Sequence, residues 1–196
     1  MILWINGAFG SGKTSAAFEL NRRLPRSFVY DPENVGYFIR RNTNGLFSDE
    51  DFQDIPLWRE MNYKILRMIA EEYDGTVIVP MTLVNPVYYN EIVERLISDG
   101  IEIKHYILYV SPDEIKRRLR KRSFGIRNED FAIDAINRCV NSFDNHITDV
   151  KIHTDKMSID EVVEKIAELA GLQLATGRLT GIKKLIFRAK VYCRHM

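Results

Sequence analysis

The residues with the clearest chemical meaning are 7–14, which read GAFGSGKT and fit the phosphate-binding loop (P-loop) pattern G-x-x-x-x-G-K-[ST]. Such a loop needs glycine where the backbone bends sharply and where a side chain would block the phosphates. Its successive N–H groups then face one anion-binding hollow, supported by the positive end of the following helix. The predicted nucleotide-binding residues are Gly7, Ala8, Phe9, Gly10, Ser11, Gly12, Lys13 and Thr14.

Two residues at the end of this loop supply the charge chemistry. Lys13 is predicted to bridge the β- and γ-phosphates, and the Thr14 hydroxyl to hold Mg²⁺. Many P-loop proteins steady the metal with an aspartate after the third strand, but residues 80–82 here read Pro-Met-Thr. We therefore expect ATP and Mg²⁺ as cofactors, with the metal held by Thr14, phosphate oxygens and water, and with Asp31 as a further candidate.

Asp31 follows the second predicted strand and precedes Pro32 and Glu33. In a structural role, aspartate is a good N-cap and proline a good first helical residue, so Asp31 would start a helix that runs to Arg40. In a functional role, a carboxylate at the carboxyl end of a parallel strand faces the crevice where α/β sheets bind ligands. One residue is able to fill both roles, and we predict that Asp31 also orients or deprotonates an acceptor.

A basic run follows the fourth predicted strand. Arg118 and Arg122 are four residues apart and share a helix face, and Arg127 lies in the short stretch after that helix. Such a run is usually a solvated helix face, but in P-loop proteins arginines at this place close over the transferring phosphoryl group. We assign Arg118, Arg122 and Arg127 a catalytic role together with Lys13 and Asp31.

Other polar and aromatic residues have two interpretations each. Arg40 and Arg41 are either surface residues or contacts for phosphate or substrate. Trp58, near the start of a predicted helix, is either a core residue or a platform for a ligand. The polar segment 42–54 is either a solvated connection or a lid.

Five short apolar runs predict the strands that must position these residues, at 2–5, 28–30, 76–80, 103–110 and 150–154. Helical periodicity and capping signals predict helices between and after them, including 14–24, 56–73, 86–98 and 158–170. Strands that alternate with helices predict an α/β fold with a parallel sheet covered by helices on both faces.

The chain divides into a P-loop domain (1–171), a linker (172–181) and a basic amphipathic helix (182–196). One stripe of that helix is apolar and comprises Ile182, Leu185, Ile186, Ala189, Cys193 and Met196. Phe187 and Val191 fall on its polar side. The helix is either a membrane-surface element or a terminal helix that packs its apolar stripe on the domain, and both interpretations stay open.

Composition agrees with a soluble globular domain of ordinary size, with 45% hydrophobic and 28% charged residues. The net charge is +1, but the six basic residues after position 168 have no acidic neighbour in that segment. Two cysteines without metal or redox spacing predict reduced thiols in the cytoplasm. We expect no nucleic-acid partner, and the basic tail suggests the anionic inner face of a membrane.

With the P-loop after the first strand, R-x-x-x-R at Arg118 and Arg122, and no guanine-recognition N-K-x-D, the chain resembles the nucleoside-monophosphate kinase group. That resemblance implies the strand order 2-3-1-4-5.

A narrower resemblance rests on residues 4–14 (WINGAFGSGKT), 30–33 (YDPE), 56–59 (PLWR) and 78–82 (IVPMT). These stretches are similar to the tunicamycin-resistance ATP-binding protein family, which implies ATP binding and resistance to a uridine-containing antibiotic.

Two functions follow from these patterns. As an enzyme, the protein would pass the γ-phosphoryl group of MgATP to a hydroxyl of a nucleoside-like or antibiotic acceptor. As a binding protein, it would sequester the antibiotic, with ATP setting its conformation and no phosphoryl transfer. The absent aspartate after the third strand favours sequestration, whereas Asp31 and the arginines favour catalysis.

Overall fold

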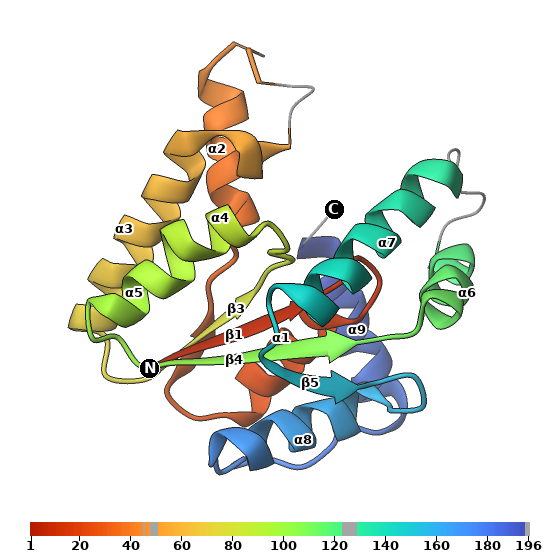
Figure 1. Cartoon of the computed structure of the whole chain (residues 1–196). Coiled ribbons are helices and arrows are strands. Elements are labelled where there is room, and N and C mark those ends of the chain that lie inside the picture. The colour runs from red at the N-terminus through yellow and green to blue at the C-terminus, as the bar shows by residue number, and fades with distance from the viewer. Residues whose placement is uncertain (45, 48–50, 123–128, 195–196) are drawn as a thin grey trace.

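The computed structural model describes residues 1–44, 46–47, 51–122 and 129–194. Its centre is a sheet of five strands that pair in parallel. The order β2-β3-β1-β4-β5 confirms the order implied by the kinase resemblance (Figure 1). The strands are β1 (Ile2–Gly7), β2 (Ser27–Val29), β3 (Thr76–Pro80), β4 (Ile103–Tyr109) and β5 (Val150–His153).

The helices lie close to their predicted positions. They are α1 (Lys13–Arg23), α2 (Glu33–Asn42), α3 (Pro56–Glu72), α6 (Pro112–Arg122), α7 (Glu129–Asn145), α8 (Ile159–Ala170) and α9 (Gly181–Arg194), with a 3₁₀ turn η1 (Phe52–Asp54) before α3. The single helix predicted over 86–98 instead contains a wider turn in its middle. Its segments are α4 (Pro86–Tyr89), the π-helical η2 (Asn90–Glu94) and α5 (Arg95–Ser98).

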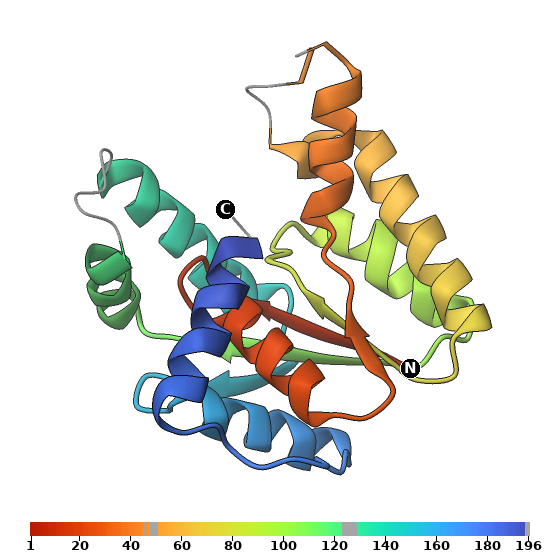
Figure 2. The ribbon, with the colours of Figure 1, turned by 180° about the vertical axis from the view of Figure 1, so that it is seen from behind.

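Alternation along the buried strands divides the core into two layers. Ile2 and Trp4 of β1 pack with the layer formed by α2 to α5 and α7, whereas Leu3 and Ile5 pack with α1 and α8. The two layers lie on opposite faces of the sheet (Figures 1 and 2). All four side chains are fully buried, so β1 is a rigid support for the loop that follows it.

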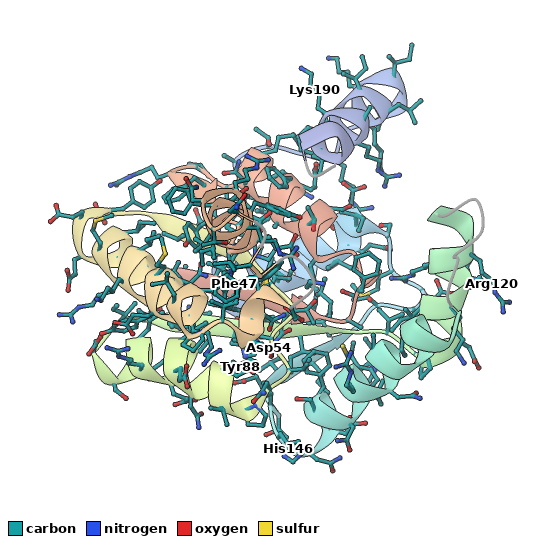
Figure 3. All side chains as sticks on the ribbon, turned by 90° about the horizontal axis from the view of Figure 1, so that it is seen from above. Phe47, Asp54, Tyr88, Arg120, His146 and Lys190 are labelled. Atoms are coloured by element: carbon teal, nitrogen blue, oxygen red, sulfur yellow. The ribbon has the colours of Figure 1, made fainter. Side chains whose placement is uncertain are left out.

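The helices around α3 form a connected group beside the sheet. Trp58 is fully buried and donates its Nε1–H to the Pro32 carbonyl at 3.0 Å, which confirms its core interpretation. The Tyr88 hydroxyl of α4 donates to Asp54 Oδ1 of η1 at 2.6 Å, and both residues are labelled in Figure 3. These bonds fix the start of α2 and the approach to α3.

The C-terminal segment returns along α1. Ala175 donates its N–H to the Arg23 carbonyl at 2.8 Å, and Arg23 Nε donates to the Thr176 carbonyl at 3.0 Å. Helix α9 then runs beside α1, as Figure 2 shows. Among the described residues, no helix combines the length and apolar character needed to cross a bilayer.

Helix α9 packs with a face that its periodicity did not predict. Three residues of its apolar stripe point outward, namely Ile182, Leu185 and Ile186, which are exposed by 74%, 67% and 52%. Phe187 and Val191, from the side that the sequence marked as polar, are half-buried, as is Lys184. The alternative in which the apolar stripe covers the domain is therefore wrong for Ile182, Leu185 and Ile186. The contact with the domain is made by the opposite face of α9.

Candidate active site

The P-loop leaves β1 at Gly7 and enters α1 at Lys13. A Cβ at Gly7 would lie 2.8 Å from the backbone oxygen of Leu108 in β4, so only glycine allows this approach. Gly12 precedes α1 with a φ of 99°, in the left-handed region that favours glycine. The sequence pattern thus corresponds to two physical needs, a close strand contact and a sharp entry into a helix.

The loop presents only part of its length to solvent. Ser11 donates its N–H to the Ala8 carbonyl at 3.0 Å, and Lys13 Nζ donates to the same oxygen at 3.2 Å. Ala8 and Ser11 are buried. The loop residues that line the adjoining cavity are Phe9, Gly10, Gly12, Lys13 and Thr14.

That cavity has a volume of about 820 Å³ and joins several separate parts of the chain. It brings Lys13 and Thr14 together with Asp31, which follows β2, and with Arg118 of α6. Its other lining residues are Ser15, Glu19, Glu33, Pro80, Thr82, Ile159, Asp160, Leu179, Lys184, Phe187, Arg188, Ala189 and Val191. Its base is the N-terminal end of α1, where the helix dipole favours an anion.

Asp31 lies at the start of α2 and also lines the cavity. Its Oδ1 accepts a hydrogen bond from the Glu33 N–H at 3.0 Å, and its carbonyl accepts one from the Asn34 N–H at 3.2 Å. The carboxylate is therefore held at the start of α2 while it lines the cavity. The adjacent Tyr30 is largely buried, which raises the pKa of its hydroxyl and keeps that group neutral.

Asn6 of β1 and the segment that follows β3 close the other side of the loop. Thr82 Oγ1 donates to the Gly7 carbonyl at 2.8 Å. The Asn6 amide pairs with the backbone of Leu83, donating to its carbonyl at 2.8 Å and accepting from its N–H at 3.0 Å. Pro80 and Thr82 line the cavity where many P-loop proteins carry an acid, so this side offers a hydroxyl and no carboxylate.

Arg118 lies across the rim of the loop. Its guanidinium donates to the Ser11 carbonyl at 3.3 Å and to the Thr154 carbonyl at 2.7 Å, and its Nε donates to Glu114 at 2.8 Å. It therefore connects α6, the P-loop and the end of β5 while it lines the cavity. Arg117 and Arg118 together lower the pKa of the Glu114 carboxyl to about 2.

The structure describes the other predicted arginines less fully than Arg118. Arg122 ends α6, and Arg127 lies outside the described residues. Arg40 and Arg41 lie in the last turn of α2, and neither lines the cavity; the Arg40 guanidinium lies 5.3 Å from the centre of the Phe52 ring. Of the arginines assigned from the sequence, the structure thus brings Arg118 to the P-loop.

The carboxylate of Asp155 joins two segments of the chain next to Arg118. Asp155 Oδ1 accepts hydrogen bonds from the N–H and the hydroxyl of Ser111, and these bonds lower the pKa of the carboxyl. The ends of β4 and β5 are thereby joined next to Arg118. The Asp155 carboxylate stays ionised at neutral pH, close to the backbone that Arg118 contacts.

Sequence reasoning missed the contribution of the C-terminal helix to this cavity. Lys184, Phe187, Arg188, Ala189 and Val191 all line it, and none was assigned to the site. Phe187 and Val191, two apolar residues on an otherwise polar face, were the available signal. Glu33 and Thr82 were also missed as lining residues, although both belong to segments quoted for the resemblance.

The fold is similar to that of known structures. The tunicamycin resistance protein of Deinococcus radiodurans is similar, with 28% identity and a TM-score of 0.74, over 90% of this chain and 99% of that chain. Shikimate kinase from Bacteroides thetaiotaomicron (21% identity, TM-score 0.59) matches over 88% of this chain and 99% of its own. Deoxyadenosine kinase from M. mycoides (16% identity, TM-score 0.54) matches over 87% and 99%.

The first of these matches confirms the resemblance to tunicamycin-resistance proteins, and the two kinases share the fold. No curated protein sequence matches the chain. The P-loop kinase-like fold predicted from the sequence is confirmed by the strand order and by these structures. The AAA domain family matches residues 2–145, and the chain belongs to that family.

Proposed function

We propose that the protein is an ATP-dependent small-molecule kinase that transfers a phosphoryl group to a hydroxyl of tunicamycin or a related nucleoside antibiotic. The observation that carries this proposal is that Lys13, Thr14 and Asp31 line one cavity. Phosphate-binding groups and a candidate base thus face the same space. A kinase needs this arrangement, because its donor and acceptor react in line within one site.

The residues present fit MgATP. Gly7 and Gly12 allow the close strand contact and the sharp helix entry of the loop, and Lys13 and Thr14 line the cavity at the positive end of α1. When bound, MgATP would supply the phosphoryl group and leave as MgADP. Among the described residues, no group of three or more His, Cys, Asp or Glu is positioned to hold a metal. Thr14, phosphate oxygens and water would hold Mg²⁺, with Asp31 as a further candidate.

Each protein group then has a definite task. Lys13 and the loop amides would bind the phosphates, and Arg118 would offset negative charge as the phosphoryl group moves. The Asp31 carboxylate would orient the acceptor hydroxyl and accept its proton. Arg122, the last residue of α6, and Arg127 keep the role predicted for them, which is to close over the phosphates.

The class of acceptor is inferred from similarity and from one exposed aromatic residue. A solved structure that is similar over most of both chains is a tunicamycin resistance protein. Phe9 of the P-loop is 68% exposed and lines the cavity. A large aromatic side chain held at a cavity wall suits stacking against a flat ring such as a nucleobase.

Sequestration is the alternative function, and it is favoured by the absence of an acid at residues 80–82, where β3 ends. Mass spectrometry of tunicamycin after incubation with the protein and MgATP separates the two. A mass increase of one phosphate, absent when Asp31→Asn replaces the parent, supports the kinase. Unchanged antibiotic that co-purifies with the protein in an ATP-dependent manner supports sequestration. A panel of nucleoside antibiotics then defines the acceptor range.

We also propose that α9 holds this cytoplasmic protein at an anionic lipid surface. The outward Ile182, Leu185 and Ile186 side chains are exposed on a segment that carries six basic and no acidic residues after position 168. Basic amphipathic helices of this kind lie in the interface of anionic bilayers. The support is the combination of exposed apolar area and charge complementarity.

A further inference from the structure

Helix α9 forms one wall of the cavity that contains the P-loop. Its residues Lys184, Phe187, Arg188 and Val191 line the same space as Lys13. Their spacing of three and four residues puts them on one face of the helix. A nucleotide bound at the P-loop would therefore be enclosed partly by the C-terminal segment of the chain.

The docked position of α9 is held by an ion pair between a partly exposed lysine and a buried carboxylate. Lys184 Nζ lies 2.5 Å from Asp160 Oδ2, and Asp160, in the first turn of α8, is only 4% exposed. A carboxylate removed from water needs a counter-charge, and breaking such a pair destabilises a fold. The Arg22 guanidinium adds a second contact, 5.9 Å from the centre of the Phe187 ring.

The two cations on the inner face of α9 are in different situations. Lys184 is neutralised by Asp160. Arg188, one turn further along, is exposed and lines the cavity that Lys13 also lines. Arginine binds phosphate oxygens through a planar pair of donors and keeps its charge at any physiological pH.

We propose that Arg188 is a nucleotide-binding residue that contacts the phosphates of a nucleotide held by the P-loop. The proposal rests on the proposed nucleotide binding, and it adds that a residue outside the P-loop domain completes the site. Since a ligand stabilises the state that it binds, nucleotide binding would hold α9 in its docked position. The orientation of the outward apolar stripe would then depend on whether a nucleotide is bound.

Titration calorimetry with MgATP on the full chain tests this proposal with four proteins. They are the parent, Arg188→Gln, Lys190→Gln and Lys13→Ala. Lys190 is the matched control, because it is exposed on the same helix and does not line the cavity (Figure 3). We expect Arg188→Gln to weaken binding about tenfold, the loss expected for one charge-assisted hydrogen bond, and Lys190→Gln to change it by less than about twofold.

The Lys13→Ala protein separates this proposal from nucleotide binding itself. If Lys13→Ala binds MgATP as the parent does, the P-loop assignment fails. If only Lys13→Ala is weakened, while Arg188→Gln binds like Lys190→Gln or better than the parent, the P-loop assignment stands and the role of Arg188 is overturned.

Hydrogen–deuterium exchange supplies a readout independent of affinity and of activity. We expect saturating MgATP to slow amide exchange in residues 181–191 of the parent and to have a smaller effect in Arg188→Gln at equal occupancy. Exchange in 181–191 that does not change on nucleotide binding would overturn the proposed contact. Because Arg188 is exposed, its substitution should leave the melting temperature unchanged, which shows that the variant is folded.

Discussion

Asp31 Oδ1 accepts a hydrogen bond from the Glu33 backbone N–H at 3.0 Å, so the carboxylate at the end of β2 is fixed by the helix that it starts. Its place in the cavity wall leaves the same side chain facing the P-loop. Position 31 therefore combines its structural role with the proposed chemical one, and substitutions are able to separate them.

Asp31→Asn keeps an oxygen that accepts the Glu33 N–H and removes the basic carboxylate. If Asp31 is the base, transfer should fall by about 10²–10⁴-fold, while MgATP affinity and melting temperature stay near parental values. The measurements are steady-state phosphoryl transfer to the antibiotic, titration calorimetry and thermal unfolding. Equal turnover in both proteins would limit Asp31 to its capping role.

Phe9→Ala tests the aromatic wall of the cavity. Removing an exposed ring that stacks on a flat acceptor should raise the KM for the antibiotic about tenfold, since base–aromatic stacking contributes about 1–3 kcal/mol. MgATP affinity should be unchanged, because the backbone amides and Lys13 remain. Phe9→Tyr is the control that keeps a ring of the same shape. A Phe9→Ala enzyme with the parental acceptor KM would contradict the stacking role.

Much of this architecture was predictable because local sequence determines it. The P-loop has a fixed pattern of glycines, and the apolar runs before and after it have the lengths of buried strands. Thr82 was harder to assign, because its contact with Gly7 joins residues 75 positions apart, and no local pattern reports such a contact.

The orientation of α9 could not be predicted, for a physical reason. Periodicity shows which residues share a stripe, but it does not show which stripe meets the domain. Here Phe187 lies by Arg22, and Lys184 pairs with the buried Asp160, so the polar face docks. The partners on α1 and α8 are more than 20 residues away in sequence, and only the folded chain brings them together.

The Asp149 carboxyl, directly before β5, makes a contact that is sensitive to acid. His105 Nδ1 lies 2.7 Å from Asp149 Oδ2, and the Tyr89 hydroxyl donates to the same oxygen at 3.0 Å. These bonds, with that of His105 the larger cause, lower the pKa of Asp149. A lowered pKa in the folded state means that the stabilisation is complete above the unfolded value of about 3.9 and is lost as pH falls through the folded value.

We therefore expect the melting temperature of the parent to fall more steeply below about pH 4 than that of Asp149→Asn. At neutral pH the variant should be the less stable of the two, because the ionised acceptor is gone. Thermal unfolding between pH 2.5 and 7 measures both effects, with the exposed Glu72→Gln as control. Parallel pH profiles for the parent and Asp149→Asn would show that this carboxyl contributes nothing to acid sensitivity.

Removal of residues 178–196 tests the two faces of α9 together. Without Lys184, the nearly buried Asp160 loses its counter-charge, and the contact between Phe187 and Arg22 is also lost. A loss of about 1–2 kcal/mol would lower the melting temperature by roughly 2–8 °C for a chain of this size. If the helix also lies on an anionic bilayer, truncation should abolish co-sedimentation with anionic vesicles.

A variant of the outer face alone separates membrane binding from folding. Ile182→Gln with Leu185→Gln and Ile186→Gln changes three exposed side chains and keeps every basic residue and the Lys184–Asp160 pair. Vesicle binding should fall strongly, since the apolar area that enters the interface is gone, while the melting temperature stays parental. The basic residues each add about 1 kcal/mol near an anionic surface, so residual binding should disappear at high salt. A full-length protein that does not sediment with anionic vesicles even at low salt would refute the membrane role of α9, and the helix would then act only as a wall of the cavity.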